Sequence, residues 1–432
     1  MAGEEPSPAG LTALQRARAI FGGSAGNLVE WYDWFVYAAF ALYFAPAFFP
    51  GGDPTVQLIK SAAVFAGGFF ARPIGAWLMG VFADRAGRKT ALTVSVALMC
   101  LGSLATALTP GYARIGPTAP AILAAARLLQ GLSVGGEYGA SATYLSEMAG
   151  RRRRGLWSSF QFVTLIGGQL VALAVLIVLQ LLLSPAQLAA WGWRIPFVIG
   201  ALLAGVVWWI QVSLEETPAF RAARPEKGSL TGALVRAHPR EATIVFFLTA
   251  GGSLAFYVFT VYMPVFLSET AHFTKAAAAR LSAISLVVFL LAQPLYGWLG
   301  DRLGRRNLLI LAFGLGALTV WPLMTALGAA RTPGRALVLV LAALALHAGY
   351  TSVSAVVKAE LFPTQVRTLG VALPYALANA LFGGTAEVVA LSLKHAGAES
   401  AFFVYVAAVL ALAFLAALAL PDTNRLGLIV ED

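Results

Sequence analysis

The chain has 432 residues, of which 59% are hydrophobic and 12% are charged. Soluble domains carry about 25% charged residues, so this composition excludes an ordinary soluble protein and indicates a membrane protein. The formal net charge is +10, but the Lys and Arg residues lie in short loops between apolar stretches, without the folded basic domain of a nucleic-acid-binding protein. We therefore attribute the excess positive charge to loops that face the cytoplasm.

The beginning of the chain and its one cysteine exclude two further features. Residues 1–18 are polar and lack the apolar segment of a secretory signal peptide, so we expect them to form a cytoplasmic tail. Cys100 is the only cysteine and lies within an apolar stretch, so no disulfide can form within the chain.

Apolar stretches follow one another from residue 19 to residue 420. They cover residues 19–46, 56–82, 89–109, 119–147, 155–183, 193–213, 241–268, 277–299, 307–327, 335–359, 368–393 and 399–420. At 1.5 Å per residue, about 20 helical residues cross the roughly 30 Å hydrocarbon core of a bilayer. The sequence therefore predicts an all-α membrane protein with twelve transmembrane helices. They form one bundle at 19–213 and a second at 241–420, joined by a linker at 214–240 and followed by a tail at 421–432.

The loops between these helices alternate in charge. One set is rich in arginine and lysine, including residues 151–154 and the linker, whereas the other set carries few cations. Because positive loops face the cytoplasm, both termini and the linker are predicted to be cytoplasmic.

A ten-residue pattern occurs once in each bundle. GVFADRAGRK at 80–89 recurs as GWLGDRLGRR at 297–306, 217 residues later and again between the second and third helices of its bundle. The chain therefore consists of two related halves, as in carriers that rock around a central site. The pattern resembles the loop motif of the major facilitator superfamily, which implies a gating role for its charged residues. These are Asp84, Arg85, Arg88, Asp301, Arg302 and Arg305.

Three charged residues of the first two helices lie near the middle of the membrane. Glu30 and Asp33 are three residues apart and share a helix face, and Arg72 reaches a similar depth from the opposite direction. An ionisable group at this depth costs at least about 2.5–3.5 kcal/mol, so each needs a partner or a function. We predict that Arg72 neutralises Glu30 or Asp33, or shares them with a substrate carboxylate; a purely structural ion-pair cluster is the alternative.

The fourth helix carries a second charged stripe. Arg127, Gln130 and Glu137 recur on one face, which we expect to line the interior together with Gln161 of the fifth helix. Arg127 either binds substrate or forms a structural pair with Glu137, and the pattern does not separate these interpretations. Glu137 is also expected to take part in proton coupling.

The second half is polar rather than charged. Hydroxyl, amide and ammonium groups there are expected to bind an anionic substrate, and one carboxylate to carry a proton. The substrate group comprises Tyr257, Tyr262, Tyr350, Lys358 and Asn379, and the carboxylate is Glu387. The alternative for Lys358 is that its side chain extends to the nearby cytoplasmic surface. His347 and Glu360 are interpreted as structural, and Arg194 as either a gate or an anchor at the other membrane surface.

No cofactor is expected. The sequence has no Walker A loop, no metal-ligand spacing and no nucleophile elbow, so transport must use an ion gradient. A buried carboxylate holds its proton more tightly, and a neighbouring arginine reverses this effect. We therefore expect Asp33 or Glu30 to take up a proton when a substrate carboxylate engages Arg72.

Five segments together resemble the metabolite:proton symporters of the major facilitator superfamily over about residues 19–420. They are GNLVEWYDWF (26–35), FFARPIG (69–75), RLLQGLSVGGEYGA (127–140), GWRIPF (192–197) and AELFPTQVRTLG (359–370). Within this family, SFQFVTLIGGQL (159–170) and NALFGGTAEVVALSLK (379–394) resemble carriers of α-ketoglutarate. The resemblance implies an inner-membrane carrier that imports a 2-oxo dicarboxylate with protons, and it implies that Arg88 and Arg194 are needed for transport. We expect the carrier to act as a monomer.

Two positions depart from that family and leave alternatives open. Ala86 replaces a histidine of the loop motif, and Pro374 replaces a small polar residue of the eleventh helix. The substrate could therefore be another organic acid, such as citrate or shikimate, or a zwitterion such as betaine. A membrane-embedded sensor and a channel are remote alternatives, because the tails are too short for a signalling domain and charged midplanes suit alternating access.

Overall fold

A computed structural model describes residues 13–86, 88–134, 142, 146, 153–213, 237–363 and 366–421, and only the backbone within 13–27, 80–92 and 207–213. Every regular element in these ranges is helical. The first half contains α1 (Ala13–Phe48), α2 (Pro54–Ala86), α3 (Arg88–Leu108), α4 (Tyr112–Ile115), α5 (Thr118–Val134), α7 (Arg154–Ser158), α8 (Phe160–Leu182), α9 (Pro185–Ala190), η3 (Gly192–Arg194) and α10 (Ile195–Ser213).

The second half repeats this order with more interruptions. It contains α13 (Pro239–Phe256), η4 (Tyr257–Val261), α14 (Met263–Glu269), α15 (Lys275–Leu303), α16 (Arg305–Gly328), α17 (Pro333–Thr351), α18 (Ser354–Glu360), α19 (Arg367–Ala378), η5 (Asn379–Gly383), α20 (Ala386–His395) and α21 (Glu399–Ala419). Both η4 and η5 are π-helical turns within otherwise α-helical spans, a distortion that is frequent at functional sites.

The twelve expected crossings are confirmed in the described part of the chain. Eight helices are long and apolar enough to cross a membrane, and three shorter apolar helices cover 93–108, 118–134 and 192–206. The first crossing is α1, which begins at Ala13 instead of residue 19. The surface is apolar, as a lipid-facing surface must be: Leu181, Leu202 and Leu318 expose 74%, 66% and 77% of their area.

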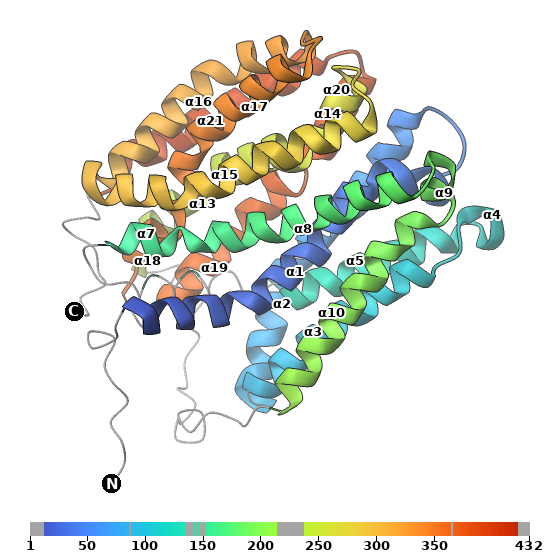
Figure 1. The fold of residues 1–432 in the computed structure, drawn as a ribbon. Coiled ribbons are helices and arrows are strands. Elements are labelled where there is room, and N and C mark those ends of the chain that lie inside the picture. The colour runs from blue at the N-terminus through green and yellow to red at the C-terminus, as the bar shows by residue number, and fades with distance from the viewer. Residues whose placement is uncertain are drawn as a thin grey trace.

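The two halves lie side by side along most of their length (Figure 1). α8 packs against α15, and α2 packs against α19, η5 and α20. Glycine makes one of these contacts possible, because a Cβ on Gly384 would lie 2.5 Å from Cγ of Phe69. α1 begins and α21 ends at one end of the bundle, the proximal end, and α4 and α9 mark the opposite, distal end (Figure 1).

Candidate substrate site and gates

Two buried arginines stack around one tryptophan near the centre of the first half. The guanidinium carbons of Arg72 (α2) and Arg127 (α5) lie 3.8 Å and 4.2 Å from the ring centroid of Trp34 (α1). Cation–π attraction thus holds the two cations within about 8 Å of each other. Arg72 is 4% exposed and Arg127 is fully buried. Gly68 lets the helices approach, since a Cβ there would lie 2.9 Å from Cη2 of Trp34 and 3.1 Å from the Arg127 carbonyl oxygen.

Both arginines keep the same edge of the guanidinium available. Among the described residues, Nε and Nη2 of Arg72 have no hydrogen-bond partner, and neither do Nε and Nη2 of Arg127. These two nitrogens form the fork that grips a carboxylate through two parallel hydrogen bonds. Buried N–H donors without a hydrogen-bond partner are costly, so two such forks side by side indicate a site for a dianion.

Asp33 is held by Gln130 and Ser103 rather than by Arg72. Gln130 Nε2 donates to Asp33 Oδ2 at 2.6 Å, and the Ser103 hydroxyl donates to Asp33 Oδ1. The Oε1 atom of Gln130 in turn accepts from Arg127 Nη1 at 2.8 Å. Of the two acids expected to neutralise Arg72, Asp33 is held elsewhere, because α5 places Gln130 between Asp33 and Arg127. Glu30, which is 5% exposed, is the acid within electrostatic range of Arg72.

The second half contributes a chain of polar groups that leads to the arginines. Lys358 (α18) is 1% exposed, and its Nζ donates to the Tyr350 hydroxyl at 3.0 Å and lies 4.9 Å from the Tyr375 ring. Asn379, the first residue of η5, donates to the Tyr375 hydroxyl at 3.5 Å. Lys358 therefore does not extend to the surface, which removes one of its two interpretations.

The two π-helical turns bring this chain to the first half. A Cβ on Gly383 would lie 2.5 Å from Asn379 Oδ1 and 2.8 Å from Tyr257 Cδ2, so Asn379 and Tyr257 lie together. The ring centroids of Tyr257 and Phe69 are 5.2 Å apart, and Phe69 lies 4.4 Å from the Arg72 guanidinium. Groups from both halves thus surround the arginine pair.

Among the contacts that the structure describes, the other residues expected in the site do not touch the arginine pair. Glu387 is 6% exposed on α20, within electrostatic range of Tyr37, and Gln161 is buried on α8. Tyr262 packs against Phe402, with ring centroids 6.0 Å apart, and its expected contact with substrate stays a prediction. Glu137 lies outside the described residues.

A buried ion-pair cluster joins the halves at the proximal end. The Asp301 carboxylate accepts from the backbone N–H groups of Gly155 at 2.8 Å and Leu156 at 3.0 Å, across the interface. Arg305 bridges Asp301 at 2.9 Å and Glu360 at 2.5 Å, and Arg154 of the first half lies 3.3 Å from Glu360. We call Arg154, Asp301, Arg305 and Glu360 the proximal latch. Glu360 was expected to be merely structural, because the sequence does not show that Arg154 approaches it from the other half.

Two other arginines expected in gates, Arg302 and Arg194, lie outside the proximal latch. Arg302 is exposed and stacks on Trp298 at 4.1 Å, outside the latch. Arg194 donates to the carbonyl groups of Ala190 at 3.1 Å and Thr109 at 3.3 Å within its own half, which favours an anchor over a gate. The side chains of Asp84, Arg85 and Arg88 lie outside the described residues.

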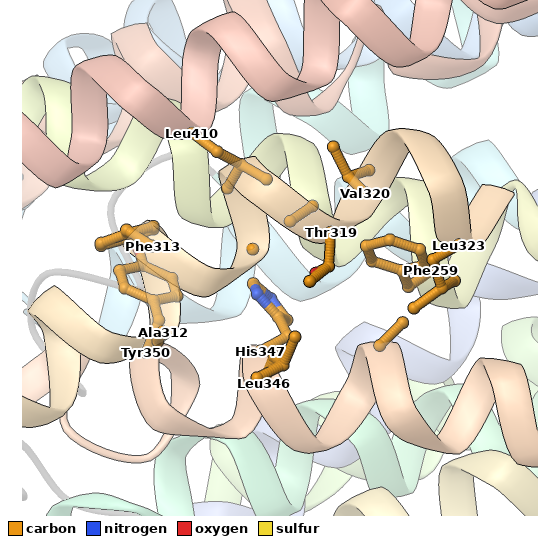
Figure 2. A pocket seen from close by; sticks show the side chains of 13 residues that line it. Phe259, Ala312, Phe313, Thr319, Val320, Leu323, Leu346, His347, Tyr350 and Leu410 are labelled. Carbon is orange, nitrogen blue, oxygen red and sulfur yellow. The ribbon is translucent and has the colours of Figure 1, made fainter.

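A small cavity in the second half is separate from the arginine pair. Figure 2 shows His347 pointing into it between α16 and α17. Its volume of about 20 Å³ is enough for a single water molecule and too small for an organic acid. His347 packs against Phe256 and Tyr350, as expected of an interior histidine.

Two related helical bundles with a charged site between them define a polytopic membrane carrier. Residues 19–229 match the sugar (and other) transporter family model, and residues 245–428 match that of the Major Facilitator Superfamily. The chain is 51% identical to the alpha-ketoglutarate permease of Escherichia coli (strain K12), over 94% of each chain. It is 33% identical to the citrate-proton symporter of Klebsiella pneumoniae, over 88% of this chain and 85% of that one. A solved structure of a proton:xylose symporter shares the fold with a TM-score of 0.78 at 19% identity, over 97% and 98% of the two chains. The chain belongs to the major facilitator superfamily and is a multi-pass membrane transporter.

Proposed function

We propose that the chain imports α-ketoglutarate, or a closely related dicarboxylate, together with protons by alternating access. The observation that carries this proposal is the pair of buried guanidinium forks on Arg72 and Arg127, which match two carboxylates. The 51% identical relative, an alpha-ketoglutarate permease, supports the choice of dicarboxylate.

Substrate binding would draw the halves together. The forks come from α2 and α5, whereas Lys358, Asn379 and Tyr257 come from the second half. A dianion between them gains contacts only when both halves close on it, and differential contact of this kind is what shifts a conformational equilibrium.

We propose that Asp33 carries the coupled proton and that Gln130 connects it to Arg127. In the empty carrier Gln130 links Arg127 to Asp33, so the positive charge of Arg127 favours the ionised carboxyl group. A substrate carboxylate on Arg127 cancels that charge, and Asp33 then takes up a proton. Glu30 beside Arg72 can act in the same way, and Glu387 remains a second candidate in the other half.

The two ends of the carrier are proposed to face opposite sides of the membrane. The proximal end, with both termini and the linker, would face the cytoplasm, and the latch would close it while substrate enters from the distal end. The inner membrane is the proposed location and a monomer the proposed unit, with no cofactor beyond the proton gradient.

Uptake of labelled α-ketoglutarate into proteoliposomes, with and without an inward proton gradient, tests this function. We expect gradient-driven accumulation that Arg72→Ala abolishes and Arg302→Gln retains, because Arg302 is an exposed arginine outside the site. Counterflow against citrate, shikimate and betaine identifies the substrate class. If a monodisperse protein takes up no α-ketoglutarate but exchanges citrate, shikimate or betaine, the proposed substrate is wrong and the assignment as a carrier stands.

A further inference from the structure

Two prolines in pseudo-equivalent helices each release a backbone carbonyl. Pro46 lies inside α1, and Pro264 lies at the start of α14, in the first and seventh crossings. They are 218 residues apart, close to the 217-residue offset of the internal repeat. Proline has no N–H, so the carbonyl four residues earlier loses its intrahelical donor. The carbonyls affected are those of Leu42 and Thr260.

Each released carbonyl accepts a hydrogen bond from the opposite half. Lys275 Nζ, at the start of α15, donates to the Leu42 oxygen at 2.8 Å. Gln169 Nε2, on α8, donates to the Thr260 oxygen at 3.0 Å. The two carbonyls are favourable acceptors, because the proline four residues later cannot supply the N–H that would otherwise bond them within the helix.

Nearby groups support the two contacts. The Lys275 ammonium lies 5.1 Å from the ring centroid of Tyr43, whose hydroxyl accepts from Gln180 Nε2 at 2.8 Å. Thr260 is 1% exposed and Gln169 is 5% exposed, so that contact is shielded from competing water. The Lys275 contact lies on the distal side of the arginine pair. The Gln169 contact lies at the depth of that pair, because a Cβ on neighbouring Gly168 would lie 2.7 Å from Cβ of Trp31.

We infer that Lys275 and Gln169 are gating residues that close the distal end by docking on the carbonyls released by Pro46 and Pro264. Opening of the distal end separates the halves and breaks both bonds, and the freed carbonyls are then hydrated. The inference rests on the alternating-access mechanism proposed above but not on the substrate, so failure of α-ketoglutarate uptake would leave it intact.

The test uses proline-to-alanine variants, because they restore an intrahelical donor without touching either docking side chain. Pro46→Ala supplies an N–H to the Leu42 carbonyl, and Pro264→Ala supplies one to Thr260, so each competes with the contact from the other half. Pro322→Ala in α16 is the matched control, since the residue four positions earlier is Leu318, which is 77% exposed and faces lipid. Removing Pro46 from the interior of α1 favours the helix, so opening in Pro46→Ala could not be attributed to helix damage. Pro264 lies in the first turn of α14, and alanine there keeps that turn helical.

The readout is the distance between spin labels at Ala113→Cys in α4 and Gly334→Cys in α17, in a Cys100→Ser background. Both sites are exposed at the distal end in opposite halves. We expect Pro46→Ala, Pro264→Ala and Gln169→Leu each to raise the distal-open population about 3- to 10-fold, and Lys275→Met by about 10-fold or more. Pro322→Ala should match the parent.

A double-mutant cycle separates the inference from a general loosening. Pro46→Ala should not raise the distal-open population further in the Lys275→Met background. Pro264→Ala should likewise not raise it further in the Gln169→Leu background. Distances unchanged in all four single variants, or additive effects within each pair, would overturn the inference. If one proline variant does not fold, the other pair tests the same claim independently.

Discussion

Glu360→Gln should open the proximal end of the carrier. The Glu360 carboxylate is 2.5 Å from Arg305 Nη1 and 3.3 Å from Arg154 Nη1, and both arginines are 4% exposed. Removing one partner of a buried ion pair costs about 3–5 kcal/mol, because the remaining charge has no counterion. Glutamine retains one acceptor oxygen, and Arg305 retains its ion pair with Asp301, so we expect a cost at the lower end of this range. A loss of about 3 kcal/mol multiplies the open-to-closed ratio by about 100.

The assay is the labelling rate of a Ser159→Cys reporter in the Cys100→Ser background. Ser159 is buried beside Gly297 at the interface next to the latch, so a membrane-impermeant maleimide reaches it only when the proximal end opens. In inside-out vesicles, Glu360→Gln should speed labelling by one to two orders of magnitude, and Arg302→Gln should leave it unchanged. A Glu360→Gln rate within twofold of the parent, in a protein that remains monodisperse, would refute a gating role for the latch.

Three further outcomes follow from the site and the distal end. Arg127→Lys keeps the charge but loses the fork, so substrate affinity measured by calorimetry should fall about 10- to 100-fold with folding intact; unchanged affinity would exclude bidentate binding. Trp34→Leu removes the ring on which both arginines stack and should abolish saturable binding, whereas Trp77→Leu, at a position 66% exposed, should not; equal behaviour would mean that stacking is dispensable. The pKa of Asp53, just before α2, lies below its ordinary value, mainly because the Thr55 backbone N–H donates to it and also because His395 faces it at 3.3 Å. The ionised form thus stabilises the fold at neutral pH, so Asp53→Asn should have a lower thermal midpoint than the parent at neutral pH. This difference in midpoint should vanish as the pH falls through the lowered pKa of Asp53, and a difference that persists in acid would contradict the prediction.

Hydropathy and the repeat were sufficient to predict the helix count and the division into halves. Unbroken apolar stretches of about 20 residues have one stable arrangement in lipid, because every backbone polar group must be satisfied within its own helix. The same cost argument identified Arg72 and Arg127, since a charge at mid-membrane depth needs a function or a partner.

Partners across the chain could not be predicted from periodicity. Arg72 and Asp33 reach similar depths, yet Asp33 bonds to Gln130 because helix rotation and packing decide which side chains meet. Trp34 is one of several aromatic residues in its stretch, and no local signal shows that it separates two arginines. Tyr262 packs against Phe402 of α21, a contact that its spacing from Tyr257 in the sequence does not indicate.

The sequence by itself determined that this protein crosses the membrane twelve times as two related halves, because local hydrophobicity and its repetition suffice for that conclusion. Only the tertiary structure decided which groups close each end. Arg154 meets Glu360 across 206 residues of chain, and Lys275 meets the Leu42 carbonyl across 233. Such contacts depend on how two complete bundles dock, and no short-range pattern encodes that geometry.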